Sequence, residues 1–383
     1  MLYHIFNNID GLSLPGMRLM SYLSFRSMLA VVLSMLISFI AGKRIIRWLQ
    51  VKQIGESIRD LGLEGQMQKK GTPTMGGMII LVSVLVSVLL VCDLSNIYIQ
   101  LLLLTTVWCG GIGFTDDYIK VFKHNKEGLS EKGKLILQFG LGLIVAFVIC
   151  ISPDIVTDNL VTTIPFVKAH EFDYSWLSPF RGQLGVYCSW GIYMIMIIIV
   201  VLACSNGVNL TDGLDGLSTG TSSIVAVVIG LLAYLSGNSI DSHYLNIMYI
   251  PGTGEIAIFM SALVGALIGF LWYNTFPAQV FMGDTGSLTI GGIIGVSAVL
   301  IRKELLLPLL CGIFLVESAS VLIQKYWFKY TRHKYGEGRR VFLMAPLHHH
   351  YQKQGIPEPR IVTRFWIVGI ILAVGTLALL KLR

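Results

Sequence analysis

The sequence predicts an all-α polytopic integral membrane protein with about ten transmembrane helices. Of its 383 residues, 54% are hydrophobic and only 13% are Asp, Glu, Lys or Arg, whereas a soluble domain carries roughly 25% charged residues. The apolar residues also come in long uncharged blocks rather than in alternating or amphipathic patterns. These observations exclude a disordered chain, a soluble two-domain enzyme and a secreted disulfide scaffold.

Ten apolar blocks approach the roughly 20 residues that a membrane helix needs. They lie at 27–42, 71–92, 94–115, 135–153, 182–211, 216–240, 256–283, 285–301, 305–324 and 365–380. The shortest blocks end in Lys or Arg, whose side chains can reach the interface. The block at 305–324 contains one acid, Glu317, which could pair with a neighbouring helix, line a wet groove or mark a break. A transmembrane β-barrel would instead show short segments of alternating polarity.

The basic residues predict the orientation of these helices. The loops at 43–70, 116–134, 205–215, 274–284 and 325–364 hold 21 of the 29 Lys and Arg residues. By the positive-inside rule, these loops are cytoplasmic and both termini face outward. No cleavable signal is expected, because the N-terminus lacks a basic region followed by an apolar stretch.

Five polar clusters, distant in sequence, fall on the predicted cytoplasmic side. They are Lys69 to Gly77, Gly113 to Lys120, Asn206 to Asp215, Phe281 to Gly286, and His348 to His350. Chance would scatter some of them to the outer side. Their common side therefore predicts one composite active site on the cytoplasmic face.

Two acidic residues, Asp116 and Asp117, end an apolar helix. Adjacent carboxylates repel each other and oppose the helix dipole at a C-terminus. A solvated helix end is the simpler interpretation, but ionisable groups at membrane depth usually mark a function. The pair is therefore interpreted as a cation-binding or catalytic group.

Asn206, Asn209, Asp212 and Asp215 recur every three residues. On a helical turn this spacing places their side-chain oxygens on one face. Intervening glycines, Gly213 among them, allow a phosphate or nucleotide to approach the backbone. Helix capping or turn formation would explain one or two of these residues, but not all four.

Asp284 stands in a Gly-Asp-Thr-Gly turn, where an Asx turn or helix cap is an equally good interpretation of the residue alone. With Asp116 and Asp117 on the same face, a metal ligand is favoured. Carboxylate oxygens suit Mg²⁺, which takes one or two carboxylates together with substrate phosphates. Zinc fits less well, because consecutive His residues cannot all face one ion on a helix and the six cysteines form no CxxC pair.

The remaining polar clusters suit an anionic ligand. His348, His349 and His350 could be a solvated tract, but imidazolium donors near carboxylates would suit a phosphate. The lysines near the Asp clusters could be topology signals alone, or they could attract a polyanion such as a nucleotide diphosphate. No basic run with interleaved aromatics indicates a nucleic-acid groove, and no nucleic-acid partner is expected. Together the clusters predict phosphoryl chemistry between a soluble polyanion and a lipid.

The motifs resemble those of the phospho-N-acetylmuramoyl-pentapeptide transferases, or translocase I enzymes, of the polyprenyl-phosphate N-acetylhexosamine-1-phosphate transferase superfamily. The matching stretches are 69–77, 115–117, 206–217, 281–287 and 344–350. The resemblance runs from about residue 20 to the C-terminus. It implies a bacterial inner-membrane enzyme that transfers phospho-MurNAc-pentapeptide from UDP-MurNAc-pentapeptide to undecaprenyl phosphate. The products would be lipid I and UMP, formed at the first membrane step of peptidoglycan synthesis.

The same resemblance implies roles for individual residues. Asp284 would hold Mg²⁺, and Asp117, with Asp116, would be nucleophile, base or metal ligand. Asn209, Asp212 and the histidines starting at His348 would position phosphates or metal. Uridine would be recognised by Asp215, Asn274 and Phe281, the last by stacking. The polar wall would be completed by Lys69 or Lys70, Thr74, Lys120, Asn206 and Gly213.

The resemblance also bears on organisation. The chain would form one transmembrane domain over 1–383, with a periplasmic excursion at 155–181 and a cytoplasmic loop at 325–361 that carries the His triplet. A homodimer within the membrane lipid is compatible with it.

Two alternatives for the activity and two for the mechanism stay open at this point. A sister enzyme using UDP-N-acetylglucosamine would share the Asp motifs and differ in the loops that meet the sugar. A transporter or flippase would need ionisable groups or broken helices near the bilayer midplane. The lipid phosphate could attack the donor directly, which is favoured because it is largely ionised at neutral pH. A phosphoryl-aspartate intermediate would instead give a two-step route.

Overall fold

Long helices dominate the structure, a computed structural model that describes residues 17–52, 71–123, 125, 127–152, 160–164, 171–245 and 247–379. The first half contains η1 (Met17–Ser21), α2 (Leu23–Val51), α3 (Gly77–Val91), α4 (Ile97–Phe122), α5 (Glu131–Ile151), β1 (Val161–Thr163), β2 (Glu171–Asp173), η3 (Tyr174–Leu177) and α6 (Gly182–Thr211). The second half contains α7 (Leu217–Gly237), α8 (Ser239–Leu245), α9 (Gly254–Asn274), α10 (Gly283–Leu300), η4 (Glu304–Leu306), α11 (Leu307–Leu310), α12 (Gly312–Tyr335), α13 (Leu347–Lys353) and α14 (Glu358–Leu379).

The prediction of an all-α polytopic membrane protein is confirmed. Within the described residues, eight helices are long and apolar enough to cross a membrane, and the pair formed by η4–α11 and α12 makes a ninth if it is taken as one span. That pair is bent by 76°, so a break accompanies the acid-bearing block at 305–324. The block at 71–92 contains the shorter apolar helix α3.

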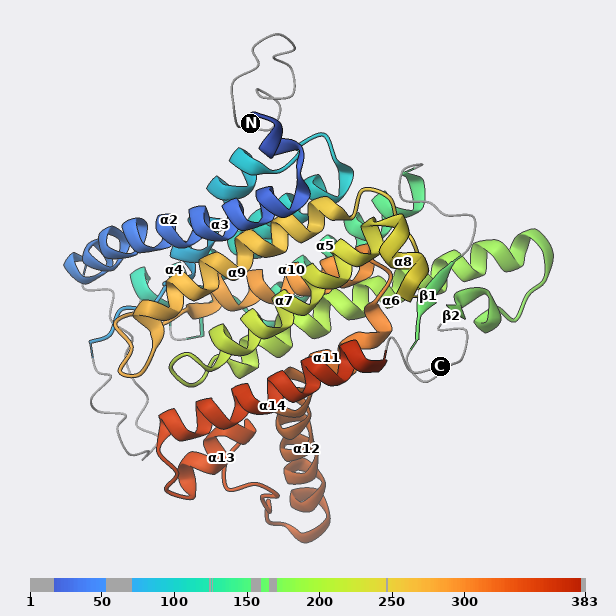
Figure 1. Cartoon of the computed structure of the whole chain (residues 1–383). Coiled ribbons are helices and arrows are strands. Elements are labelled where there is room, and N and C mark those ends of the chain that lie inside the picture. Colours follow the sequence, from blue (N-terminus) through green and yellow to red (C-terminus); the bar gives the residue numbers. More distant parts are fainter. Residues whose placement is uncertain are drawn as a thin grey trace.

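Two helices, α9 and α10, occupy the centre of the bundle (Figure 1). The α10 helix packs against α3, α4, α6 and α7, and glycines on its surface make this approach close. A Cβ at Gly291 would collide with the α6 backbone at Cys204 and Ser205, and one at Gly292 would meet the Cys109 sulfur of α4. Small residues at such contacts let helix backbones approach and gain dispersion contacts within a membrane. This packing fixes where α10 begins, relative to the ends of α4 and α6.

A short antiparallel hairpin of β1 and β2 lies at the end of the bundle where α10 ends (Figure 1). It falls in the segment expected as an excursion at 155–181, which is described only in part. The loop after α10 holds the hairpin through buried polar contacts. Lys303 Nζ donates to Thr163 Oγ1 over 2.6 Å, and the Tyr174 hydroxyl donates to Glu304 Oε1 over 2.9 Å. Charged groups at this depth need such partners to offset their desolvation.

The buried Lys303 predicts how stability depends on pH. Burial lowers the pKa of its ammonium group to about 8, although the Glu304 carboxylate acts in the opposite direction. In an unfolded chain the pKa of this group is about 10.4. Between these values the unfolded state binds more protons, so the free energy of unfolding should rise with pH by roughly 1 kcal/mol per unit. Thermal unfolding in detergent should show wild type gaining Tm relative to Lys303→Met between pH 8 and 9.5. A Tm difference that stays constant over this interval would contradict the prediction.

Candidate active site

Three carboxylates meet where α4 ends and α10 begins. Asp116 and Asp117 come from α4, and Asp284 comes from the first turn of α10. One oxygen of each lies within 4.8 Å of the others. Asp116 and Asp117 are buried, at 0% and 3% exposure. The sequence therefore predicted correctly that these acids lie together, although Asp117 and Asp284 are 167 residues apart along the chain.

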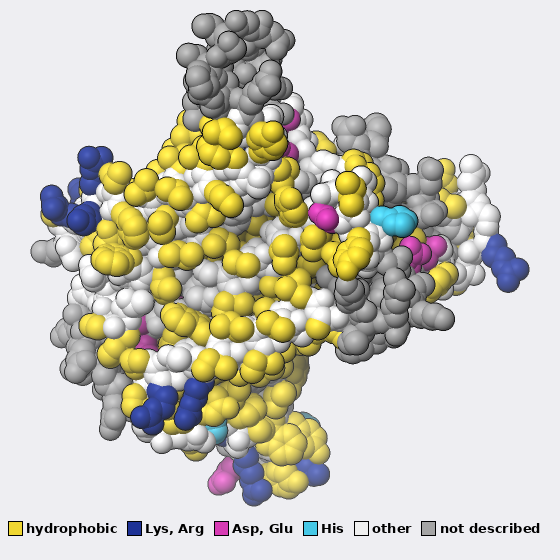
Figure 2. All heavy atoms as spheres, in the orientation of Figure 1, with side chains coloured by type: hydrophobic (Ala, Val, Ile, Leu, Met, Phe, Trp, Pro, Cys, Tyr) yellow, Lys and Arg dark blue, Asp and Glu magenta, His cyan; other side chains and the backbone are white. Residues whose placement is uncertain are grey.

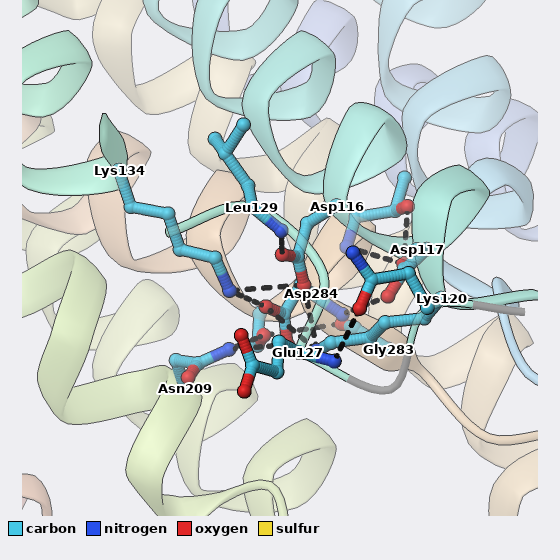
Figure 3. A network of polar contacts seen from close by, with 12 residues as sticks. Asp116, Asp117, Lys120, Glu127, Leu129, Lys134, Asn209, Gly283 and Asp284 are labelled. Atoms are coloured by element: carbon cyan, nitrogen blue, oxygen red, sulfur yellow. Dashed lines mark hydrogen bonds and ion pairs between the residues drawn. The ribbon is translucent and has the colours of Figure 1, made fainter. Parts of the chain in front are cut away.

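Two lysines neutralise part of this charge (Figure 3). Lys120 Nζ lies 2.6 Å from Asp116 Oδ2 and 3.4 Å from Asp284 Oδ2. Lys134, in the first turns of α5, contacts the same two oxygens and lies 2.9 Å from that of Asp116. Sequence reasoning identified Lys120 and missed Lys134, which stood among several lysines read as topology signals. The carboxylate cluster and its two lysines thus bring together three carboxylates and two ammonium groups.

Asp117 is hydrogen-bonded to the N-terminus of α10. Its Oδ2 accepts from the Thr285 amide over 2.9 Å and from the Thr285 hydroxyl over 2.6 Å, and its Oδ1 accepts from the Asp284 amide over 3.1 Å. The first amides of a helix have no partner within it and attract a negative charge. Both oxygens of Asp117 are therefore engaged by α10. Asp116, by comparison, accepts from the Leu129 amide through Oδ1 over 2.7 Å.

Glycine is required immediately before Asp284. Gly283 has φ +72°, and a Cβ there would lie 2.7 Å from Asp117 Oδ2 and 3.2 Å from Thr74 Oγ1. The predicted site residue Thr74 therefore lies beside Asp117. Its segment runs along the Phe281 segment, since the Phe281 amide donates to Pro73 O over 2.8 Å. Lys69 and Lys70, at the start of the same motif, lie outside the described residues.

The Asn and Asp residues that end α6 divide into two groups. Asn209 Nδ2 donates to Asp284 Oδ1 and to Ser287 Oγ, both over 2.9 Å, and thus belongs to the carboxylate cluster. Asn206 Nδ2 instead donates to Gln138 Oε1 on α5 over 2.9 Å. Equal spacing along a helix does not give equal partners, because the neighbouring helices differ on each side. Asp212 follows as the half-buried C-cap of α6.

Asp215 and Asn274, both expected at a uridine pocket, join the turn after α6 to the loop after α9. Asp215 Oδ2 accepts from the Ala278 amide over 3.0 Å. Asn274 Oδ1 accepts from the Gly216 amide over 3.1 Å. Both side chains are buried, at 4% and 3% exposure. Their contacts hold the loop that leads to Phe281, which is itself half-buried.

The three histidines start α13 and face different partners. His348 is fully buried; its Nδ1 lies 3.1 Å from Glu317 Oε2, and its ring packs against Gly213 in the turn after α6. His349 Nδ1 lies 2.7 Å from Gln352 Oε1. His350 Nδ1 accepts from the Leu343 amide over 3.1 Å. Of the interpretations offered for Glu317, pairing with a neighbouring helix is thus confirmed.

The cluster fits a divalent cation by its chemistry. It offers several carboxylate oxygens close together, which is the donor set that Mg²⁺ prefers, and it offers no thiolate. Next to His348, an apolar cavity of about 440 Å³ opens between α12, α13 and α14. Its lining includes Ile313, Val316, Leu347 and Phe365, with Arg364 as the charged residue. The carboxylate cluster and the apolar cavity are connected through α6, whose last turns carry Asn209 and pack against α12.

Comparison with known proteins covers the whole chain. The family model described as Glycosyl transferase family 4 matches residues 99–302. Proteins from Parabacteroides distasonis and Flavobacterium psychrophilum are each 53% identical to it, and one from Porphyromonas gingivalis is 50% identical. In each case the match covers 100% of both chains. All three relatives are named phospho-N-acetylmuramoyl-pentapeptide-transferase.

The geometry at Gly283 predicts a site-specific effect of adding one methyl group. Gly283→Ala must both strain a left-handed backbone, at about 1–2 kcal/mol, and displace the Asp117 carboxylate. Gly336→Ala is the matched control, because Gly336 has φ +79° and nothing within 4 Å of its Cβ position. We expect Gly283→Ala to lower Tm further and to weaken Mn²⁺ binding, followed by electron paramagnetic resonance. Equal effects of the two substitutions would refute the assigned contact.

Proposed function

The chain belongs to the phospho-N-acetylmuramoyl-pentapeptide transferase family, and we propose that it transfers phospho-MurNAc-pentapeptide from UDP-MurNAc-pentapeptide to undecaprenyl phosphate. The products would be lipid I and UMP, at the first membrane step of peptidoglycan synthesis. The protein is a multi-pass protein of the bacterial inner membrane. The observation that carries the proposal is the gathering of three carboxylates and two lysines at the ends of apolar helices.

The proposed topology has ten spans, both termini outside and the site on the cytoplasmic face. The excess of Lys and Arg in the loops on that side supports it. Asp284 begins α10, whereas the hairpin contacts the loop after α10, so the carboxylates and the hairpin lie toward opposite ends of one helix. The segment 155–181 would then be periplasmic, and 325–361 cytoplasmic. A homodimer is proposed from the family resemblance alone.

Asp284 and Asp117 would hold Mg²⁺, with Asp116 beside them. When bound, the ion would supply positive charge to the diphosphate of the donor. Lys120 and Lys134 would contact the same phosphates, because their ammonium groups already face the carboxylate cluster. Asn209 would orient Asp284 through the amide contact to its Oδ1. The site residues would thus position the β-phosphate and spread its charge.

Direct attack by the lipid phosphate is favoured as the mechanism. An oxygen of undecaprenyl phosphate would form a bond to the β-phosphorus while the bond from that phosphorus to the bridging oxygen breaks, so that UMP leaves. A phosphoryl-aspartate route would need a free carboxylate oxygen as nucleophile. Oδ2 of Asp117 accepts two hydrogen bonds from α10 and Oδ1 accepts one, which supports a positioning role and leaves Oδ1 a lone pair for a metal ion. Asp116 could accept the last proton of the lipid phosphate.

Specificity for the donor and acceptor would come from two neighbouring regions. The loop held by Asp215 and Asn274 would present Phe281 for stacking on uracil. The histidines His348 to His350, with Asp212 and Gly213, would border the phosphates. The apolar cavity between α12, α13 and α14 would receive part of the prenyl chain, because its lining offers hydrocarbon and one cation.

A transporter and a sister transferase would differ from the proposed enzyme in the position of their ionisable groups or in the donor that they use. A transporter would place its ionisable groups near the bilayer midplane, whereas the carboxylate cluster lies at helix ends. The sister enzyme that uses UDP-N-acetylglucosamine differs in the donor sugar. The full-length relatives carry the muramoyl-pentapeptide name, which favours the activity proposed here.

The two donors distinguish the enzymes directly. Detergent-solubilised protein with undecaprenyl phosphate and Mg²⁺ should release UMP from UDP-MurNAc-pentapeptide and not from UDP-N-acetylglucosamine. Release from the second donor alone would assign the chain to the sister enzyme. No release from either, by protein whose Tm shows it to be folded, would refute the proposed activity.

Removal of one charge should test the metal assignment. Asp284→Asn keeps the shape of the side chain but loses the anionic ligand, so turnover should fall by roughly 100-fold or more. Added Mg²⁺ should not restore it, and Tm should change little. Asp241→Asn is the matched control and should keep wild-type turnover, because Asp241 lies on α8, which packs against α7 and follows its C-terminal end. Near-normal turnover of Asp284→Asn would refute the assignment.

A further inference from the structure

The α12 helix leaves the bundle sideways. It is bent by 76° from the preceding η4–α11 segment, and Figure 1 shows it running across the direction of α7, α9 and α14. At its start, Phe314 packs against Gly207, which lies in the last turns of α6. Those turns also carry Asn209 and lead to the carboxylate cluster. Because α12 is the second part of this bent span, its outer half is directed sideways from the bundle, on the side of the active site.

The outer half of α12 has two different exposed flanks. Lys325, Lys329 and Arg332 follow one another at helical spacing and share one flank. The other flank is aromatic and aliphatic, and it consists of Ile323, Tyr326, Trp327 and Tyr330, all of which are well exposed. Thr331 is buried between the flanks. A helix with a basic flank and an apolar flank rich in aromatics is typical of one that lies in a membrane interface.

The chain after α12 folds back onto this helix and is hydrogen-bonded to it. Gly336 ends the helix with φ +79°. The chain then turns back along α12, where the Arg339 amide donates to Thr331 Oγ1 over 2.9 Å and the Phe342 amide donates to Gln324 Oε1 over 3.0 Å. Together, residues 323–342 are called the basic tip.

The basic tip carries a strong excess of positive charge. Its cations are Lys325, Lys329, Arg332, Lys334, Arg339 and Arg340, and its acid is Glu337. Lys334 Nζ and the Arg339 guanidinium lie 5.3 and 5.0 Å from the centre of the Tyr335 ring. Among the described residues, none of the six cations forms an ion pair with a carboxylate. Figure 2 shows basic and hydrophobic side chains side by side at the end of the molecule where α12 ends.

We propose that the basic tip binds anionic phospholipids of the leaflet at the active-site face. Its cations attract the negative headgroups, and its aromatic flank inserts below them. A lipid with a zwitterionic headgroup would bind the aromatic flank but would not attract the cations. A soluble polyanion would bind the cations but offers no hydrocarbon to the aromatic flank. The two flanks together therefore specify an anionic lipid. This proposal concerns a surface outside the carboxylate cluster and does not depend on the proposed transfer reaction.

Trp327 provides a direct reporter. The full-length protein would be reconstituted into phosphatidylcholine vesicles that contain a fixed fraction of either brominated phosphatidylglycerol or brominated phosphatidylcholine. The difference in fluorescence between wild type and Trp327→Phe gives the quenching of Trp327 itself. We expect brominated phosphatidylglycerol to quench Trp327 at least about twofold more than brominated phosphatidylcholine does.

The matched variants remove equal charge from two places. K325Q/K329Q/R332Q should abolish the preference for phosphatidylglycerol, whereas K43Q/R44Q/R47Q, on exposed positions of α2, should retain it. Tm values equal to that of wild type would establish that both variants are folded. Equal quenching by the two lipids in wild type would overturn the proposal. A preference that survives the α12 substitutions, or no quenching by either lipid, would do the same.

Discussion

The hydrogen bonds from the first turn of α10 to the Asp117 carboxylate are the contact on which the geometry of the site depends. A buried carboxylate and the unpaired amides of a helix N-terminus would each be costly alone. Together they satisfy one another, at 2.9 Å from the Thr285 amide and 3.1 Å from the Asp284 amide. The same contact fixes the end of α4 against the start of α10. Asp116 and Asp284 are thereby placed face to face, because each is the chain neighbour of a residue in that contact.

Close packing below the site keeps this contact in register. A Cβ at Gly113 would collide with the Asp284 backbone, and one at Gly77 would collide with Gly286. The ends of α3, α4 and α10 therefore meet backbone to backbone. Lipid offers no hydrophobic effect to hold membrane helices together, so such contacts contribute through dispersion and fixed geometry. The glycines at these contacts thus allow the helix ends that carry the site to meet closely.

The sequence was sufficient to predict the helices, their membrane setting and the meeting of the three acids. These features follow from hydropathy and from charges that are too costly to bury without a purpose. Lys134 and Ser287 were not predicted, because a lysine near a helix start and a serine in an apolar helix are common without any role. Their function arises only from the neighbours that tertiary packing supplies.

The sequence did not predict the partners of two motif residues. Asn206 lies one turn from Asn209, yet its amide contacts Gln138 on α5. His348 is held by Glu317 and covered by the turn after α6. Spacing along one helix can predict which side chains share a face, but the partner on that face comes from a helix far away in the chain. The sideways path of α12 was likewise not predicted, because the sequence placed its apolar first half in one block at 305–324 and gave no sign of the direction or the 76° angle of the bend.

The charge of the site limits the reactions that it can support. With three carboxylates and two lysines, the cluster is negative unless one acid is protonated. A nucleotide diphosphate is itself an anion, and at short range in a poorly hydrated pocket the repulsion between them would be strong. A divalent cation held by Asp117 and Asp284 would supply two positive charges and so reverse the sign of that interaction. The two lysines could then turn from the acids to the phosphate oxygens. The arrangement therefore suits a substrate that arrives with a metal ion or meets one already bound, and it is poorly suited to binding the same diphosphate alone.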